Sequence, residues 1–213
     1  MAKNISQHIH RVNPYEGLEL MDLDEQGWNS TGESFKAAIE ATNARTIIEV
    51  GTWKGGSALT MAAATKELGY SNQEVEIVCI DTFLGSWEHH TSMASFLQPG
   101  NGEKKFGRPT IYEQFLSNVI RKEYTDVITP FPIDSFNGAL CLEKWQVKAD
   151  LIYVDAGHDY DSVFADFKLY QKVLRDGGMI LIDDWHHGPI KDAAKAVFGD
   201  TIQDYYGKAV WTK

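Results

Sequence analysis

The sequence has few cysteines and no long apolar run. Its 213 residues contain two cysteines, Cys79 and Cys141, without a C-x-x-C pair or a Cys/His pattern. This excludes a disulfide framework and a cysteine-rich zinc site, and it favours a reducing, cytoplasmic compartment. No stretch of about 18 apolar residues occurs, so we expect no membrane-spanning helix. Residues 1–17 lack the apolar segment of a secretory signal.

Basic residues are also scarce relative to acidic ones. Lys and Arg number 20 against 30 Asp and Glu, which gives a formal net charge of −10. Because such a surface repels phosphate backbones and no basic stripe is present, nucleic acid is not an expected partner. The balance favours a small ligand or a cation, although net charge taken alone is better explained by solubility. Whether the chain forms a homo-oligomer stays open, and a membrane partner is not expected.

The sequence instead has short β-branched runs that alternate with helical patterns. This alternation predicts a mostly parallel sheet covered by helices on both faces. The predicted helices cover residues 30–44, 57–68, 111–124, 160–174 and 189–198. The predicted strands cover residues 46–50, 75–80, 127–133, 149–154 and 179–182, followed by closing strands at 201–206 and 209–212, the last antiparallel. The two prolines of the third strand predict an edge or strained position for it.

We expect one domain over residues 31–213, preceded by an N-terminal arm over residues 1–30. Residues 84–110 contain Gly, Pro, His, Ser and Trp without a clear period. Because ordinary connections are much shorter, this segment is predicted to be a functional lid or insert. The arm and the lid are expected to shape a substrate pocket.

Acidic residues stand at the carboxyl ends of the predicted strands. Ligands of open α/β sheets bind outside these strand ends, near the switch in strand order, so the acids are expected to meet at one rim. Several carboxylates at one rim repel one another, which favours a ligand or a cation that relieves the repulsion. The acids are Glu49, Asp81, Asp155, Asp183 and Asp184.

A glycine-rich turn, from Gly51 to Ser57, follows the first predicted strand. Glycine lets the backbone turn sharply and approach a ligand, and the following helix offers free N–H groups to an anion. Alone, this turn is compatible with NAD, a nucleotide or S-adenosylmethionine. Its spacing lacks both G-x-G-x-x-G and the phosphate-binding G-K-[ST] ending, which disfavours the first two ligands. Trp53 in this turn offers an aromatic wall that suits adenine or a sugar face.

Asp81 ends the second predicted strand. A carboxylate at this point can accept hydrogen bonds from both hydroxyls of a ribose. The alternative is that Asp81 caps a turn or a helix. We favour ribose binding, and we assign the adjacent Thr82 to the same site.

Asp155 and the pair Asp183–Asp184 end two further predicted strands. Hard divalent cations such as Mg2+ prefer carboxylate oxygens, so Asp155 with Asp183 or Asp184 forms a candidate metal site. Neighbours on a strand point to opposite faces, so both acids of the pair can bind a metal only if the strand has ended before them. The alternative is that one of them caps the next helix or stabilises the loop.

The order of these motifs over residues 30–187 resembles the class I S-adenosylmethionine-dependent methyltransferases. Within this class the chain resembles the metal-dependent O-methyltransferases, such as the catechol enzymes, and most closely the macrolide and aminocoumarin sugar O-methyltransferases and the cephalosporin-hydroxylase-like branch. The resemblance implies a Rossmann-like, doubly wound sheet of seven strands, with S-adenosyl-L-methionine and Mg2+ or another divalent cation as cofactors. It implies methyl transfer to a hydroxyl of a small molecule, first a sugar or other vicinal diol and second a catechol-like phenol.

The resemblance also implies which residues bind each part of the cofactor. Glu49 and Gly51 would bind the methionine part, with Ser57 placed to hold its carboxylate. Asp134 and Ser135, which follow the third strand, would approach the adenine. The other implied members are Asp81 for the ribose, Asp155 beside the cofactor, and Asp155, Asp183 and Asp184 as metal ligands.

His158 is the predicted general base. In the catechol enzymes a lysine stands three residues after the first metal ligand; His158 has that position here, and the resulting D-x-x-H resembles the sugar branch. In the implied mechanism the metal polarises a substrate hydroxyl, His158 accepts its proton, and the oxygen attacks the methyl group. An ordinary imidazole pKa of about 6.5 suits this task near neutral pH. The alternative is a surface histidine that caps the following helix.

Besides a different activity on the same scaffold, such as a hydroxylase-like or esterase-like one, for which no G-x-S-x-G nucleophile turn is present, two other functions stay open on the sequence alone. One is an NAD(P)-binding oxidoreductase on the same kind of sheet, which would have no use for the pair Asp183–Asp184. The other is a non-catalytic protein that binds S-adenosylmethionine or S-adenosylhomocysteine, which only kinetics can exclude.

Overall fold

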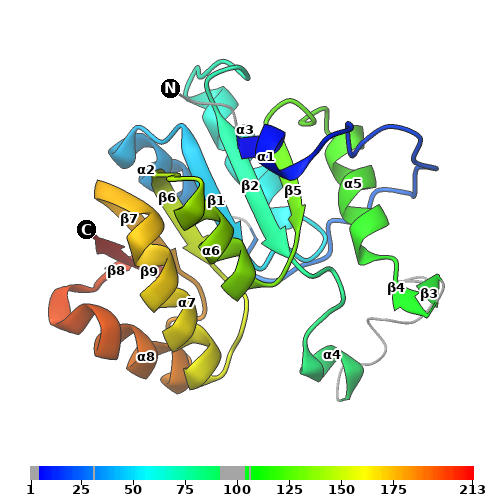
Figure 1. The fold of residues 1–213 in the computed structure, drawn as a ribbon. Helices are drawn as coiled ribbons and strands as arrows, with labels where there is room; N and C mark the ends of the chain where they lie inside the picture. Colours follow the sequence, from blue (N-terminus) through cyan, green and yellow to red (C-terminus); the bar gives the residue numbers. More distant parts are fainter. Residues whose placement is uncertain (1–4, 31, 92–103, 106) are drawn as a thin grey trace.

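A seven-stranded sheet forms the centre of the molecule, with strand order β5-β2-β1-β6-β7-β9-β8 (Figure 1). The computed structural model describes residues 5–30, 32–91, 104, 105 and 107–213. Strand β9 runs antiparallel to both of its neighbours, and the pairs formed by β5, β2, β1, β6 and β7 are parallel. The strands are β1 (Thr46–Val50), β2 (Glu76–Asp81), β5 (Ile128–Pro132), β6 (Ala149–Val154), β7 (Leu174–Ile182), β8 (Gln203–Tyr205) and β9 (Lys208–Thr212).

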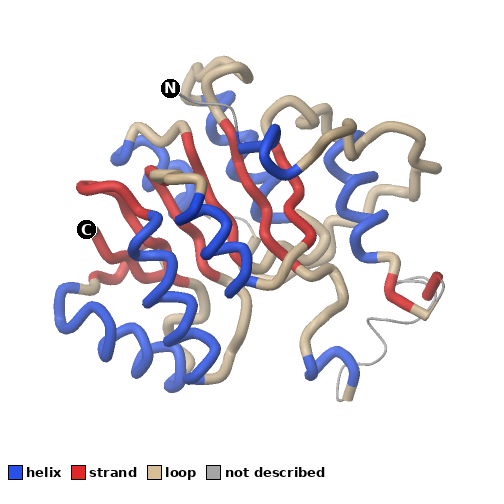
Figure 2. Tube along the Cα trace, in the orientation of Figure 1, coloured by secondary structure: helices blue, strands red, loops and turns tan. Residues whose placement is uncertain are grey.

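Helices cover both faces of this sheet (Figure 2). One face carries α2 (Glu33–Thr42), α3 (Gly56–Glu67) and α5 (Ile111–Arg121). The other carries α1 (Ile5–Ile9), α6 (Ser135–Lys144), α7 (Tyr160–Val173) and α8 (Gly188–Phe198). Alternate strand residues supply the two apolar layers: Ile47 packs with the first group of helices and Ile48 with the second. The short elements are α4 (Trp87–His90), β3 (Lys104–Lys105), β4 (Arg108–Pro109) and the 3-10 helix η2 (Gly199–Thr201).

The predicted fold class is confirmed, including seven strands and an antiparallel last strand. Strand β5 lies at one edge of the sheet, as its prolines predicted. Three α-helices were not predicted: α1, the short α4, and α6. Helix α6 begins after Asp134, whose side chain accepts a hydrogen bond from the backbone N–H of Asn137 at 2.9 Å. The predicted lid contains α4 and the β3–β4 hairpin, and its residues 92–103 and 106 lie outside the described residues. The division into arm, domain and lid stays a prediction.

The strand order changes direction between β1 and β6, which is where the site lies. From β1 the chain adds β2 and β5 on one side, then returns to add β6 and β7 on the other. The backbone N–H of Asp155, just after β6, donates to the carbonyl of Val50 at 2.8 Å, so the ends of the two strands meet. Such a switch point is the usual position of a ligand crevice in an open α/β sheet. No helix among the described residues is long and apolar enough to cross a membrane.

Candidate active site

A cavity of ≈ 920 Å³ opens at the carboxyl ends of the parallel strands. Almost all of the predicted site residues line it, although they come from separate parts of the chain. Glu49 does not line it and lies buried directly behind Ser57. The predicted residues that line the cavity are Gly51, Trp53, Ser57, Asp81, Thr82, Asp134, Ser135, Asp155, His158, Asp183 and Asp184. The structure therefore brings these residues together, while the role assigned to each stays a prediction.

The glycine-rich turn brings its backbone close to the end of β6. Gly51 has φ 86°, a conformation that favours glycine. A Cβ atom at this position would lie 2.0 Å from the carbonyl oxygen of Asp155 and 2.6 Å from the Cα of Ala156. Gly51 is therefore required both for the turn and for the close approach of the two strand ends that form the floor of the cavity.

Asp81 holds the glycine-rich turn in place. Its Oδ2 accepts hydrogen bonds from the backbone N–H groups of Thr52 and Trp53, each at 2.8 Å, and its Oδ1 accepts one from Phe83 at 2.7 Å. This is the turn-capping alternative considered for Asp81. The carboxyl group also lines the cavity, and a carboxylate oxygen has a second lone pair for a further donor. Its ribose-binding role stays a prediction.

Glu49 is a fully buried carboxyl group beneath the turn. It accepts hydrogen bonds from the hydroxyls of Ser57 and of Thr52, the latter at 3.1 Å. Burial raises the pKa of Glu49 to about 7, although the hydrogen bonds from Ser57 and Thr52 oppose the shift. Ser57 therefore already uses its hydroxyl hydrogen, and its predicted contact with a cofactor carboxylate would have to come from the backbone or after a change of partner.

Replacement of Glu49 by Gln should change how stability depends on pH. Because the folded-state pKa is about 7 and the ordinary value is 4.5, the unfolded chain loses this proton first as pH rises. The buried carboxylate of Glu49 therefore destabilises the folded wild type as pH rises. This destabilisation is absent near pH 4.5 and reaches its full value of about 3 kcal/mol above about pH 7. Urea unfolding of the ligand-free protein should show Glu49→Gln gaining stability relative to wild type across that window. The exposed Glu143→Gln is the matched control, and an equal response in both variants would contradict the assignment.

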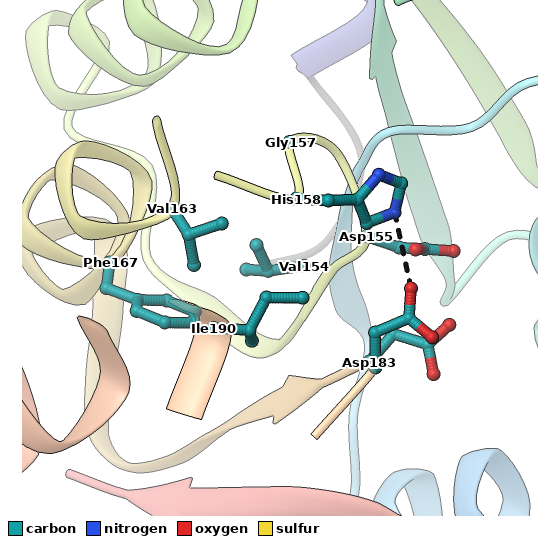
Figure 3. A pocket seen from close by; sticks show the side chains of 9 residues that line it. Val154, Asp155, Gly157, His158, Val163, Phe167, Asp183 and Ile190 are labelled. Atoms are coloured by element: carbon teal, nitrogen blue, oxygen red, sulfur yellow. Dashed lines mark ion pairs between the residues drawn. The ribbon is translucent and has the colours of Figure 1, made fainter. Parts of the chain in front are cut away.

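Three side chains at the far end of the cavity form a compact group of potential metal ligands. One ligand atom from each of Asp155, His158 and Asp184 lies within 4.8 Å of the other two. His158 Nε2 and Asp184 Oδ2 are 3.2 Å apart, with the His158 side chain 38% exposed (Figure 3). In the same view the carboxylates of Asp155 and Asp183 lie on one side of the site, opposite apolar groups that include Val163.

Asp183 and Asp184 have different surroundings although they are neighbours in sequence. Strand β7 ends at Ile182, and Asp184 has φ 46°, so the strand has ended before the pair, as shared metal binding would require. Asp184 faces His158, whereas Asp183 is almost fully buried and forms an ion pair with Lys208 at 2.5 Å. The assignment of both as metal ligands stays a prediction.

The charges of this group influence one another. Burial and then the neighbouring Asp183 carboxylate raise the pKa of Asp155. The hydrogen bond from His158 lowers the pKa of Asp184, and the same contact raises the pKa of His158 against the opposing effect of burial. The site therefore favours positive charge at the position between these three side chains.

Comparison with known proteins gives the family. Residues 48–185 match the family described as a methyltransferase domain, a range that includes the glycine-rich turn and all three potential metal ligands. The chain belongs to this methyltransferase-domain family. The predicted resemblance of the chain to the methyltransferases is thereby confirmed.

Individual relatives of this methyltransferase domain are distant. Uncharacterized protein R132 of Acanthamoeba polyphaga mimivirus is 25% identical over 140 residues, which are 66% of this chain and 51% of that protein. The chain thus spans about half the length of the curated relative. The crystal structure of CalS11, a calicheamicin methyltransferase, superposes with a TM-score of 0.61 at 19% identity and covers 84% of this chain and 77% of that one. An O-methyltransferase from Bacillus cereus, in complex with SAH, gives 0.56 at 16% identity, covering 99% and 90%. These structures share the fold.

The predicted N-terminal arm and helix α4 supply cavity residues that the sequence analysis did not name. Gln26 and Trp28 line the cavity, and Gln26 Oε1 accepts a hydrogen bond from the indole N–H of Trp53 at 3.1 Å. His89 of α4 stacks on Trp53, with ring centroids 4.4 Å apart and planes at 16°. Buried Lys54 anchors the segment through an ion pair with Asp24 at 2.6 Å. Gln26, Trp28 and His89 lie in segments without a hydrophobic period, so no pattern predicted them.

Proposed function

We propose that this chain is an S-adenosylmethionine-dependent O-methyltransferase, assisted by a divalent metal such as Mg2+, that acts on a small polyhydroxyl compound. One observation carries the proposal. The glycine-rich turn with Asp81 and the group of Asp155, His158 and Asp184 line the same cavity. A methyl donor held at the first part and a hydroxyl held at the second would be neighbours, which is what group transfer between them requires.

The cofactor end of the cavity suits a nucleoside that carries an amino-acid tail. Asp81 can accept from ribose hydroxyls, and Asp134 and Ser135 line the cavity where β5 passes into α6, the predicted adenine end. The start of α3 at Gly56 offers backbone N–H groups to a carboxylate. The Bacillus cereus relative is described in complex with SAH, the product form of this cofactor, which supports the same choice here.

The donor atoms of the acidic group fit a divalent cation. The carboxylates of Asp155 and Asp184 are donors that Mg2+ or Mn2+ accepts, and the imidazole of His158 lies within 4.8 Å of them. Asp155 and Asp184 would hold the ion, with Asp183 the third predicted ligand. A bound cation would act as a Lewis acid that lowers the pKa of a substrate hydroxyl.

His158 would remove the proton from that hydroxyl. Its Nε2 lies at the mouth of the acidic group, 3.2 Å from Asp184. The Asp184 carboxylate orients the ring and favours its protonated form once the proton is taken, which supports a general base. The cavity walls would hold the acceptor oxygen in line with the methyl group, and alignment of this kind accounts for much of the acceleration in group transfer.

The cavity favours an acceptor without negative charge. Its described lining includes seven acidic residues and no Lys or Arg. The rings of Trp53 and His89 stack on one wall, and aromatic faces suit the apolar face of a sugar or a phenol ring. The structure of CalS11 is also described as that of a TDP-rhamnose 3'-O-methyltransferase, which supports a sugar acceptor. The absence of Lys and Arg among the described lining residues favours a sugar or diol without phosphate.

Matched vicinal diols of different charge test both the reaction and the acceptor. With S-adenosylmethionine and Mg2+, we expect dopamine and catechol to be methylated with kcat/KM at least about tenfold above that of 3,4-dihydroxybenzoate, because the anion meets the acidic lining. Mass spectrometry of the products measures the transfer, and EDTA should abolish it. Preference for the anion would contradict the acceptor class. Transfer that survives EDTA would contradict the metal. Calorimetry with S-adenosylmethionine and with NADH separates this function from an oxidoreductase.

A further inference from the structure

The last strand of the sheet places a lysine beneath the acidic end of the cavity. Lys208, at the start of β9, is 4% exposed. Its ammonium donates to Asp183 Oδ1 at 2.5 Å, to the carbonyl of Asn29 at 3.1 Å and to the hydroxyl of Tyr153 at 3.3 Å. The rings of Phe35 and Tyr153 lie 5.2 and 5.0 Å from Nζ. All three hydrogens of the ammonium therefore have acceptors, and its charge lies against aromatic faces.

The ion pair with Lys208 gives Asp183 a different role from its neighbour Asp184. The side chain of Asp183 is 5% exposed and pairs with Lys208, whereas that of Asp184 is 21% exposed and faces His158. A buried carboxylate that left its lysine to bind a metal would leave the ammonium unpaired in the interior, which is strongly unfavourable. A cation bound to Asp183 would also lie close to the ammonium and be repelled by it. Asp183 is therefore best suited to be a counter-ion.

Lys208 also acts on the cavity through Tyr153. An ammonium group can only donate, so the oxygen of Tyr153 accepts from Lys208 and its own hydrogen must point elsewhere. That hydrogen goes to Asp155 Oδ2, 3.1 Å from the phenol oxygen. The chain of contacts from Lys208 through Tyr153 thus fixes the orientation of the Asp155 carboxylate at the cavity wall.

We propose that Lys208 is a positioning residue of the active site. It holds Asp183 as its counter-ion and orients Asp155 through Tyr153, which leaves Asp155 and Asp184 as the carboxylates available to a divalent cation. The inference rests on the proposed function for the cation itself. It differs from the ligand set implied by family resemblance, in which both neighbouring aspartates bind the metal.

Titration calorimetry with Mn2+ tests whether Asp184 is a metal ligand and Asp183 is not. We expect Asp184→Asn to weaken Mn2+ binding by about 100-fold or more, because a ligand is lost. The double variant Asp183→Asn with Lys208→Met removes the ion pair without leaving a buried charge and should weaken it about tenfold at most. Tyr153→Phe should weaken it about tenfold. A double variant as impaired as Asp184→Asn would overturn the counter-ion role, and unchanged binding in Tyr153→Phe would overturn the orienting role.

Thermal unfolding tests the pair independently of the metal. Lys208→Met should lower the unfolding temperature by about 6 °C or more, because Asp183 is left buried and unpaired. Adding Asp183→Asn should recover more than half of that loss, and strictly additive effects would show that the two residues are not partners. A native-like folded baseline in each unfolding curve shows that every variant still folds. If the wild type binds no Mn2+, the metal-assisted part of the proposed function is wrong. The unfolding measurements still test whether Asp183 and Lys208 form an ion pair that stabilises the fold.

Discussion

Replacement of His158 by Ala is expected to lower kcat for methyl transfer by a factor of about 10² or more, the usual contribution of a positioned general base. The imidazole lies beside the acidic group that would hold the acceptor hydroxyl, with Nε2 3.2 Å from Asp184. No other histidine belongs to that group among the described residues. Binding of S-adenosylmethionine should not change, because the cofactor end of the cavity is formed by other residues. Steady-state kinetics and calorimetry measure the two effects separately.

Two controls make the role of His158 specific. His90→Gln alters an exposed histidine that does not line the cavity and should leave kcat unchanged. Added imidazole should restore part of the activity of His158→Ala, because a free base can enter the space left by the side chain. Full activity of His158→Ala in the presence of Mg2+ would rule out the assignment as base, and a loss of S-adenosylmethionine affinity equal to the loss of kcat would show a structural role instead.

Replacement of Gly51 by Ala is expected to have the largest effect on stability and on cofactor binding. The added Cβ would lie 2.0 Å from the carbonyl oxygen of Asp155, and this contact is with backbone that cannot rotate away. Relief would require β1 and β6 to separate at the switch point, where Asp155 donates to Val50. We expect a loss of roughly 3–5 kcal/mol in the free energy of unfolding. S-adenosylmethionine binding should become undetectable by calorimetry.

Gly69 is the matched control for this substitution. It also has a positive φ, 78°, but a Cβ there meets nothing within 4 Å. Gly69→Ala should therefore carry only the conformational cost of a left-handed alanine, about 1–2 kcal/mol, with cofactor binding retained. Chemical denaturation of the two variants separates backbone strain from steric overlap. Equal losses in both would show that the close approach at Gly51 does not matter.

Most of the fold could be predicted because hydrophobic pattern and sheet position agree. The run from Thr46 to Val50 is β-branched except for Glu49 and almost fully buried, and the structure has a strand over the same residues. Helix α6 was missed for a local reason. It has ten residues with Gly138 inside them, and the cap that starts it, Asp134, was interpreted only as a contact to adenine. A Cβ at Gly138 would lie 3.0 Å from Ile80, so close packing on β2 explains the glycine.

The site could be predicted only in so far as it follows from strand ends. Asp81, Asp155 and Asp184 reach one cavity because parallel strands end at the same edge. The partner of Asp183 could not be read, because Lys208 resembles any exposed strand lysine until the pairing of Ile182 with Ala209 brings it beside the acid. The contribution of Trp28 depends on how an irregular segment crosses the cavity, and no periodicity encodes that path.

The ion pair between β7 and β9 also has a consequence for biosynthesis. Lys208 follows Asp183 by 25 residues, so a growing chain contains the acidic strand ends before it contains the cation that balances them. A nascent chain that has folded only as far as β7 would keep Asp183 solvated, because its burial has no compensation yet. Docking of β9 beside β7 would then neutralise the acid and cover that edge of the strand in one late folding event.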